Sequence, residues 1–172
     1  MPLFVEADEI VPNLWQGSYP GTGRAVGASD FTMLVLCARD LQDPAELFPG
    51  VEVVHAPNDD DRQHPLTREH LQIAVQAAHQ VKAAVQQGRK VLVTCRAGMN
   101  RSGLVSALTL HFMYGWDGQT CIDRVQRYRR SGNNNYKPLS NHEFTNALKR
   151  LKATSKIPGG WQKNPSGILI PV

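Results

Sequence analysis

The sequence predicts a single α/β domain with a central, mostly parallel, twisted sheet of about four to five strands flanked by helices. Short apolar runs separated by Gly, Pro and Asp come early in the chain, and amphipathic helical patterns dominate its later part. One segment around Cys95 joins a strand, a short loop and a helix. The length of 172 residues and the hydrophobic fraction of 41% suit one domain with a sizeable core.

Four apolar runs are expected to form strands, near residues 10–15, 33–37, 51–56 and 91–94. The last of these runs has no alternation between apolar and polar side chains. That pattern is typical of a strand that is covered on both faces, as in a parallel sheet.

Four helices are expected. The first spans residues 67–87, with Thr67 as its N-cap and Gly88 as its stop. The second begins at about residue 101 and ends near 115, and the third runs from about 117 to before 132. The fourth follows "SNHEF", where Ser140 and Glu143 match a capping box. We expect the folded domain to cover residues 1–152 and a Pro- and Gly-containing tail to cover 153–172.

Charge, cysteine content and apolar runs indicate which partners and which cellular compartment to expect. A net charge of +4 weakly favours anionic partners. The three cysteines are Cys37, Cys95 and Cys121; their odd number and irregular spacing favour a reducing compartment, so we expect a cytoplasmic protein. We expect no leader, no membrane association, no cofactor and no metal site, because no long apolar run or metal-ligand spacing is present. We expect a monomer.

The segment "VLVTCRAGMNRSG" has the features of an anion-binding loop that ends in a helix N-terminus. Gly98 lets the loop curl, and the Arg101 guanidinium can bind two oxygens of a tetrahedral oxyanion. The same field favours the thiolate of Cys95, and Ser102 is positioned to donate a hydrogen bond to its sulfur. The expected anion-binding residues are Arg96, Ala97, Gly98, Met99, Asn100 and Arg101.

A buried structural cysteine beside an incidental helix start is the alternative interpretation. The strand before Cys95, the glycine within the loop and the helix after it together favour the catalytic interpretation.

Cys95, Arg101 and Ser102 resemble the signature loop of the cysteine-dependent protein phosphatases, and "CRAGMNRSG" is most similar to their dual-specificity branch. Four further segments resemble parts of that branch: "IVPNLWQGSYP", "FTMLVLCARD", "VEVVHAPNDDD" and "YKPLSNHEFTNAL". The resemblance covers roughly residues 10–151. It implies a hydrolase that removes phosphate from phosphotyrosine, or from phosphoserine and phosphothreonine, in proteins through a phosphocysteine intermediate.

The resemblance also implies a general acid on a loop near the cysteine. Asp60 lies three residues after Pro57, the offset at which the family commonly has its acid. Asp59 is the second candidate and Asp61 the third, while the alternative is an acidic turn that only faces water. Asn141 is expected to brace the cysteine loop.

Four basic residues form either a rim that attracts anionic substrates or a helix end that faces water; they are Arg127, Arg129, Arg130 and Lys137. The chain departs from the family in two places. Thr94 replaces the usual His before the cysteine, which removes one usual source of thiolate stabilisation. Asn100 resembles the corresponding residue of RNA 5′-triphosphatases, so RNA is the partner under that alternative.

Other functions stay open on sequence alone: a phosphoinositide phosphatase, a catalytically weak phospho-binding module, and a sulfur-transfer protein of the rhodanese type. The last leaves the Asp-rich loop and "KPLSNHEF" without a role.

Overall fold

The computed structural model describes residues 5–130, 137–154, 161–163 and 168–171. Its strands are β1 (Ala7–Val11), β2 (Leu14–Ser18), β3 (Met33–Ala38), β4 (Glu52–Asn58), β5 (Val91–Cys95), β6 (Trp161–Lys163) and β7 (Leu169–Pro171). Its helices are α1 (Ala25–Ala28), α2 (Arg68–Gln86), α3 (Arg101–Tyr114), α4 (Gly118–Tyr128) and α5 (His142–Lys149), with a short 3-10 turn at Ala45–Leu47.

The central sheet has five strands in the order β1-β2-β5-β3-β4, and only β1 runs antiparallel to its neighbour. This confirms the predicted mostly parallel sheet. The single strand predicted at residues 10–15 is wrong, because two strands meet there in a tight turn. Asn13 in this turn has a φ of 71°, and asparagine adopts this left-handed conformation more readily than most residues.

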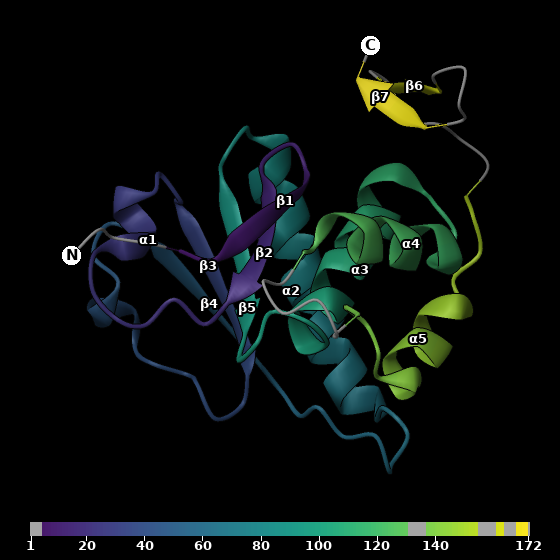
Figure 1. The fold of residues 1–172 in the computed structure, drawn as a ribbon, viewed down its shortest axis with the longest axis horizontal. Helices are drawn as coiled ribbons and strands as arrows, with labels where there is room; N and C mark the ends of the chain where they lie inside the picture. Colours follow the sequence, from purple (N-terminus) through teal and green to yellow (C-terminus); the bar gives the residue numbers. More distant parts are fainter. Residues whose placement is uncertain (1–4, 131–136, 155–160, 164–167, 172) are drawn as a thin grey trace.

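Helices α2 to α5 gather on one face of the sheet, whereas α1 lies against the other (Figure 1). Successive strand residues point to opposite faces. Val35 and Val93 therefore pack toward the large helical layer, and Leu34 and Leu92 pack toward the smaller core that includes Val26 of α1. Strand β5 is thus buried on both faces, as its uninterrupted apolar sequence predicts.

One of the two predicted helix N-caps is confirmed, and the other is wrong. Thr67 caps α2 by accepting a hydrogen bond from the His70 N–H, as predicted. The predicted capping box at Ser140 is wrong. Asn141 is the N-cap of α5, and its side chain accepts a hydrogen bond from the Glu143 N–H.

Four parallel strands end at the same edge of the sheet, at Ser18 (β2), Ala38 (β3), Asn58 (β4) and Cys95 (β5). The loops that follow β3, β4 and β5 therefore meet there, which is the usual position of a ligand site in such a sheet. The 153–172 segment contains the antiparallel pair of β6 and β7. Among the described helices, none is both long enough and apolar enough to cross a bilayer.

Candidate active site

Cys95 is the last residue of β5 and begins the loop that leads into α3. It is only 4% exposed. Its Sγ lies 3.2 Å from the Oγ of Ser102, in the first turn of α3. The structure therefore brings together the two side chains that the sequence pairs across the loop.

The peptide carbonyls of the cysteine loop point away from its centre, because each accepts a hydrogen bond from outside the loop. The pairs are Arg96 O with the Tyr19 N–H (3.2 Å), Ala97 O with Arg129 Nη2 (3.2 Å), Gly98 O with Arg129 Nε (2.9 Å) and Gln16 Nε2 (3.0 Å), and Met99 O with the Leu139 N–H (3.2 Å). In a trans peptide the C=O and N–H point in opposite directions. The N–H groups of residues 97–100 are therefore directed into the loop, as in an anion-binding nest.

Gly98 is the position where this loop needs a glycine. Its φ is +68°, a conformation that side chains disfavour. A Cβ there would also lie 2.3 Å from the carbonyl carbon of Gly17 in β2. The loop can therefore pack against β2 only because residue 98 has no side chain.

Arg129 lies just beyond the end of α4 and braces the cysteine loop from behind. Its side chain is fully buried. Besides its bonds to the loop carbonyls, it pairs with Glu6 (Nη1 to Oε1, 2.6 Å) and Asp8 (Nη1 to Oδ2, 2.8 Å). Arg129 therefore takes no part in an exposed basic rim, whereas its neighbours Arg127 and Arg130 are exposed.

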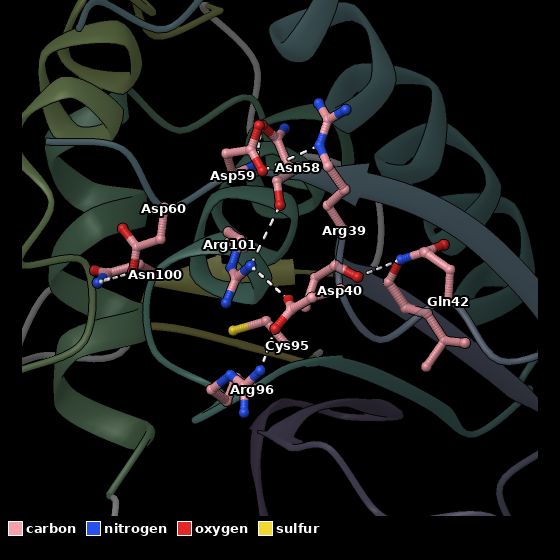
Figure 2. Close-up of polar contacts among 12 residues, drawn as sticks. Arg39, Asp40, Gln42, Asn58, Asp59, Asp60, Cys95, Arg96, Asn100 and Arg101 are labelled. Carbon is pink, nitrogen blue, oxygen red and sulfur yellow. Dashed lines mark hydrogen bonds and ion pairs between the residues drawn. The ribbon is translucent and has the colours of Figure 1, made fainter. Parts of the chain in front are cut away.

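Arg101 begins α3 and lies over the loop beside Cys95 (Figure 2). Its Nη1 donates to the carbonyl of Asn58 (3.3 Å) and to Oδ1 of Asp40 (3.4 Å). Its Nε is buried and has no hydrogen-bond partner in the structure. One end of the guanidinium is thus held by the protein while a buried N–H stays available, an arrangement suited to an anion.

Asp40 lies in the loop after β3 and links two arginines of the site, because its carboxylate also accepts from Arg96 Nη2 (Figure 2). The hydrogen bond from Arg96 is the largest effect that lowers the pKa of Asp40 below its ordinary value. Asp40 is therefore an anionic partner for Arg101 at neutral pH. The negative charge of Asp40 thus contacts the positive charges of both Arg96 and Arg101.

Asp60 is held against the cysteine loop by two side-chain amides. Its Oδ2 accepts from Asn100 Nδ2 (2.9 Å), and its Oδ1 accepts from Asn141 Nδ2 (2.7 Å). The Asn141 backbone N–H in turn donates to Asn100 Oδ1 (3.1 Å). These contacts tie the loop after β4, the cysteine loop and the start of α5 into one network.

The other two aspartates of this loop face elsewhere. Asp59 pairs with Arg39 (3.0 Å) and its side chain is 48% exposed. Asp61 accepts from the backbone of its own turn and pairs with His64 (2.8 Å), with 46% exposure. The Gln63 N–H is the largest effect that lowers the pKa of Asp61. Within the described part of the chain, Asp60 is the only one of these three aspartates whose side chain is hydrogen-bonded to the cysteine loop.

No family model matches the sequence, and a sequence comparison with curated proteins finds no match. Solved structures do match. A mouse putative dual specificity phosphatase has 23% identity and a TM-score of 0.67, over 87% of each chain. Human DUSP28 has 22% identity and a TM-score of 0.67, over 88% of this chain and 95% of that one. A human tyrosine phosphatase-like serine/threonine/tyrosine-interacting protein has 18% identity and a TM-score of 0.62, over 86% and 95%.

The chain has the dual-specificity phosphatase fold. Within this fold, Thr94 precedes Cys95 and is completely buried. Its hydroxyl donates to the Val35 carbonyl of β3 (3.0 Å). Thr94 therefore stabilises the sheet beneath the loop. Its hydroxyl proton is engaged in this hydrogen bond and is not donated to Cys95.

Sequence reasoning missed two residues that position the site of this dual-specificity phosphatase fold, Gln16 and Asp40. Gln16 is a fully buried polar residue in β2 that holds the Gly98 carbonyl. A polar side chain within an apolar strand is a signal, because burial requires a hydrogen-bond partner. Asp40 follows β3 at the same sheet edge as Cys95, so strand order is the signal for that residue.

Lys137, the last member of the expected basic rim, is exposed. In the described parts of the chain, no group of three or more His, Cys, Asp or Glu side chains is arranged to hold a metal ion.

Proposed function

We propose that this chain hydrolyses phosphate monoesters in proteins, phosphotyrosine or phosphoserine and phosphothreonine, through a phosphocysteine intermediate. One observation carries the proposal. The carbonyls of residues 96–99 are held outward, so that the N–H groups of residues 97–100 face into the loop that Cys95 begins, and Arg101 with its unpartnered Nε lies beside Cys95. A phosphate bound there accepts several hydrogen bonds and has its phosphorus in front of a nucleophile.

In the first step, the Cys95 thiolate attacks phosphorus while the ester oxygen leaves. Asp60 donates the proton that this oxygen takes, and its amide contacts hold it at the loop for this role. In the second step, water attacks the phosphocysteine and Asp60 accepts a proton from it. Ser102 then donates to the departing sulfur, at the distance of 3.2 Å found here.

One solved structure of this fold holds a tetrahedral oxyanion. The mouse structure is a complex with zinc tungstate. Tungstate is a tetrahedral oxyanion, as phosphate is. We propose that the equivalent ligand of this chain is the phosphoryl group of the substrate.

The charges around the site favour a substrate with one phosphate over a polyphosphate. Arg96 pairs with Asp40, and Arg39 pairs with Asp59. These pairs leave little positive charge at the mouth for the further phosphates of a triphosphate-ended RNA or a phosphoinositide. Asn100, which resembles the triphosphatase residue, already holds Asp60.

A substrate panel tests the proposal. It compares an aryl phosphate, a phosphotyrosine peptide, a phosphothreonine peptide, a phosphoinositide and triphosphate-ended RNA. Each is assayed with the wild type and with Cys95→Ser. We expect release of phosphate from the aryl substrate and at least one peptide, and complete loss in the variant. Binding of phosphopeptide without turnover would instead identify a phospho-binding module. Preferred release from the RNA would identify a triphosphatase.

A further inference from the structure

Asp40 joins an arginine inside the anion-binding site to an arginine at its mouth. Its Oδ1 lies 3.4 Å from Arg101 Nη1, and its Oδ2 accepts a hydrogen bond from Arg96 Nη2 (Figure 2). The side chain of Arg101 is only 12% exposed, whereas that of Arg96 is 66% exposed. The carboxylate of Asp40 therefore lies at the boundary between the site and the solvent.

The second phosphate of a polyphosphate would have to lie at the same boundary. In phosphoryl transfer the attacking and leaving atoms are roughly in line with phosphorus, so the leaving group lies opposite the Cys95 sulfur, at the mouth. In a polyphosphate the leaving group is itself a charged phosphate, and arginine forks are well suited to bind it. Arg96 and Nη1 of Arg101 are donors at this place, and the carboxylate of Asp40 already engages both.

The negative charge of Asp40 stays at the mouth even when its ion pair with Arg96 opens. Such exposed pairs are individually weak, so pairing alone would not exclude a second phosphate. However, Gln42 Nε2 donates to the carbonyl oxygens of Leu36 (2.8 Å) and Ala38 (2.7 Å), which folds the loop back on the end of β3. The hydrogen bond from Arg96 keeps the pKa of Asp40 below its ordinary value, so the carboxylate is charged at neutral pH.

We propose that Asp40 is a specificity-determining residue that restricts this site to substrates with a single phosphate. Its carboxylate takes the place of a second phosphoryl group and repels that group, whereas the uncharged carbon side of a monoester meets no such repulsion. Removal of the carboxylate opens a second anion subsite formed by Arg96 and Nη1 of Arg101. The inference deepens the proposed hydrolysis of monoesters and rests on that function for its effect on turnover, but its effect on anion binding needs no turnover.

Asp43 offers a matched control in the same loop. Its carboxylate accepts a hydrogen bond from the hydroxyl group of Tyr19, which follows β2. Asp43→Asn therefore removes the same charge from the same loop without releasing a donor of Arg96 or Arg101. A specific effect of Asp40 is distinguished in this way from a general change of net charge.

Anion binding by a protein without the nucleophile tests the proposal. Orthophosphate and pyrophosphate are titrated at pH 7 into Cys95→Ser, alone and combined with Asp40→Asn or Asp43→Asn, by isothermal titration calorimetry. We expect Asp40→Asn to lower the ratio of the pyrophosphate Kd to the orthophosphate Kd about tenfold, the effect of one charge removed a few ångströms away in a partly solvated site. Asp43→Asn should leave the ratio unchanged. Equal ratios in all three proteins, equal shifts in both combined variants, or no binding of either anion would overturn the proposal.

A further substitution tests which donor binds the second phosphate. Adding Arg96→Gln to the Asp40→Asn protein should raise the Kd ratio again, because the released guanidinium is then gone. A ratio that stays low would contradict a subsite that includes Arg96.

Turnover separates this inference from the proposed function. With Cys95 intact, Asp40→Asn should raise the rate of phosphate release from pyrophosphate relative to an aryl phosphate about tenfold. Asp40→Glu keeps the carboxylate and should keep the wild-type preference for the aryl phosphate; a preference shifted as far as in Asp40→Asn would contradict the role of the charge. If the wild type has no turnover, the hydrolytic function fails, but the calorimetric ratios still decide the role of Asp40.

Discussion

Arg129 Nε lies 2.9 Å from the Gly98 carbonyl oxygen, so a buried arginine from the end of α4 sets the direction of a peptide in the cysteine loop. Since Glu6 and Asp8 balance its charge on the other side, the arginine is fixed at both ends. The anion-binding N–H groups are therefore oriented by residues from outside the loop.

Replacing Arg129 should weaken the site and the fold together. Arg129→Met removes the donors to Ala97 O and Gly98 O and leaves two carboxylates unpaired. Because Glu6 and Asp8 are 36% and 30% exposed, water can solvate them after the change, and the loss of stability should be smaller than the roughly 3–5 kcal/mol of a fully buried pair. We expect that loss in urea unfolding, with a raised inhibition constant for vanadate at temperatures where the variant is folded. Arg130→Met, at an exposed neighbour, is the control and should change neither quantity. Unchanged vanadate inhibition in Arg129→Met would show that the loop holds its shape unaided.

The pairing with Glu6 predicts a pH dependence of stability. The hydrogen bond from Arg129 lowers the pKa of Glu6 below its ordinary value of 4.5. The pair therefore stabilises the fold fully above that pH, and its contribution is lost as the pH falls through the lowered pKa. Wild type should exceed Glu6→Gln in free energy of unfolding at pH 7, and the difference should shrink below about pH 4.5. In the Arg129→Met background the same Glu6 change should lose this pH dependence; its persistence there would assign the effect to another partner.

The Arg101 guanidinium should be irreplaceable by an ammonium. Arg101→Lys keeps the charge but cannot donate to Asp40 and to a phosphate oxygen in the planar geometry of the fork. We expect kcat/KM for an aryl phosphate to fall about 10²–10³-fold, the usual effect of losing a donor to developing charge. Arg96→Lys is the control at an exposed position and should cost far less. A variant Arg101→Lys that keeps most of its activity would make Arg101 a purely structural residue.

The loss of rate on replacing Asp60 should be larger for substrates with poorer leaving groups. If it protonates the ester oxygen, Asp60→Asn slows alkyl phosphates by about 10²–10⁴-fold and aryl phosphates with good leaving groups much less. Asp59→Asn and Asp61→Asn are matched controls from the same loop with smaller expected effects. Steady-state rates across a series of leaving groups give the comparison. Equal losses on all substrates would instead point to folding of the loop, and no loss in any of the three variants would remove the acid from this segment.

Contiguous parts of the site could be predicted from the sequence. The cysteine loop, its glycine and the start of α3 all lie within residues 95–102. Their spacing in the sequence is therefore enough to predict how they are arranged. Asp60 lies outside this stretch, and only the resemblance to known phosphatases selects it; the structure places it against the loop through Asn100.

Long-range contacts could not be predicted in this way. The position of Arg129 depends on Glu6, which is 123 residues away in sequence, and the neighbouring arginines look equivalent in the sequence. The N-cap of α5 was also misplaced by one residue, because Ser140 and Asn141 are both good caps and only the contacts of Asn141 with Asp60 and Asn100 distinguish them.

The phosphocysteine intermediate is the central claim, and rapid quenching tests it most directly. Ser102→Ala removes the donor that helps the sulfur to depart, so the second step should become slower than the first and the intermediate should accumulate. An aryl phosphate mixed with this variant and quenched in acid should release one aryl alcohol per active site in a burst. Mass spectrometry of the digest should then find the phosphoryl group on the peptide containing Cys95. A phosphoryl group on any other residue, or steady turnover with neither burst nor modified Cys95, would contradict the account.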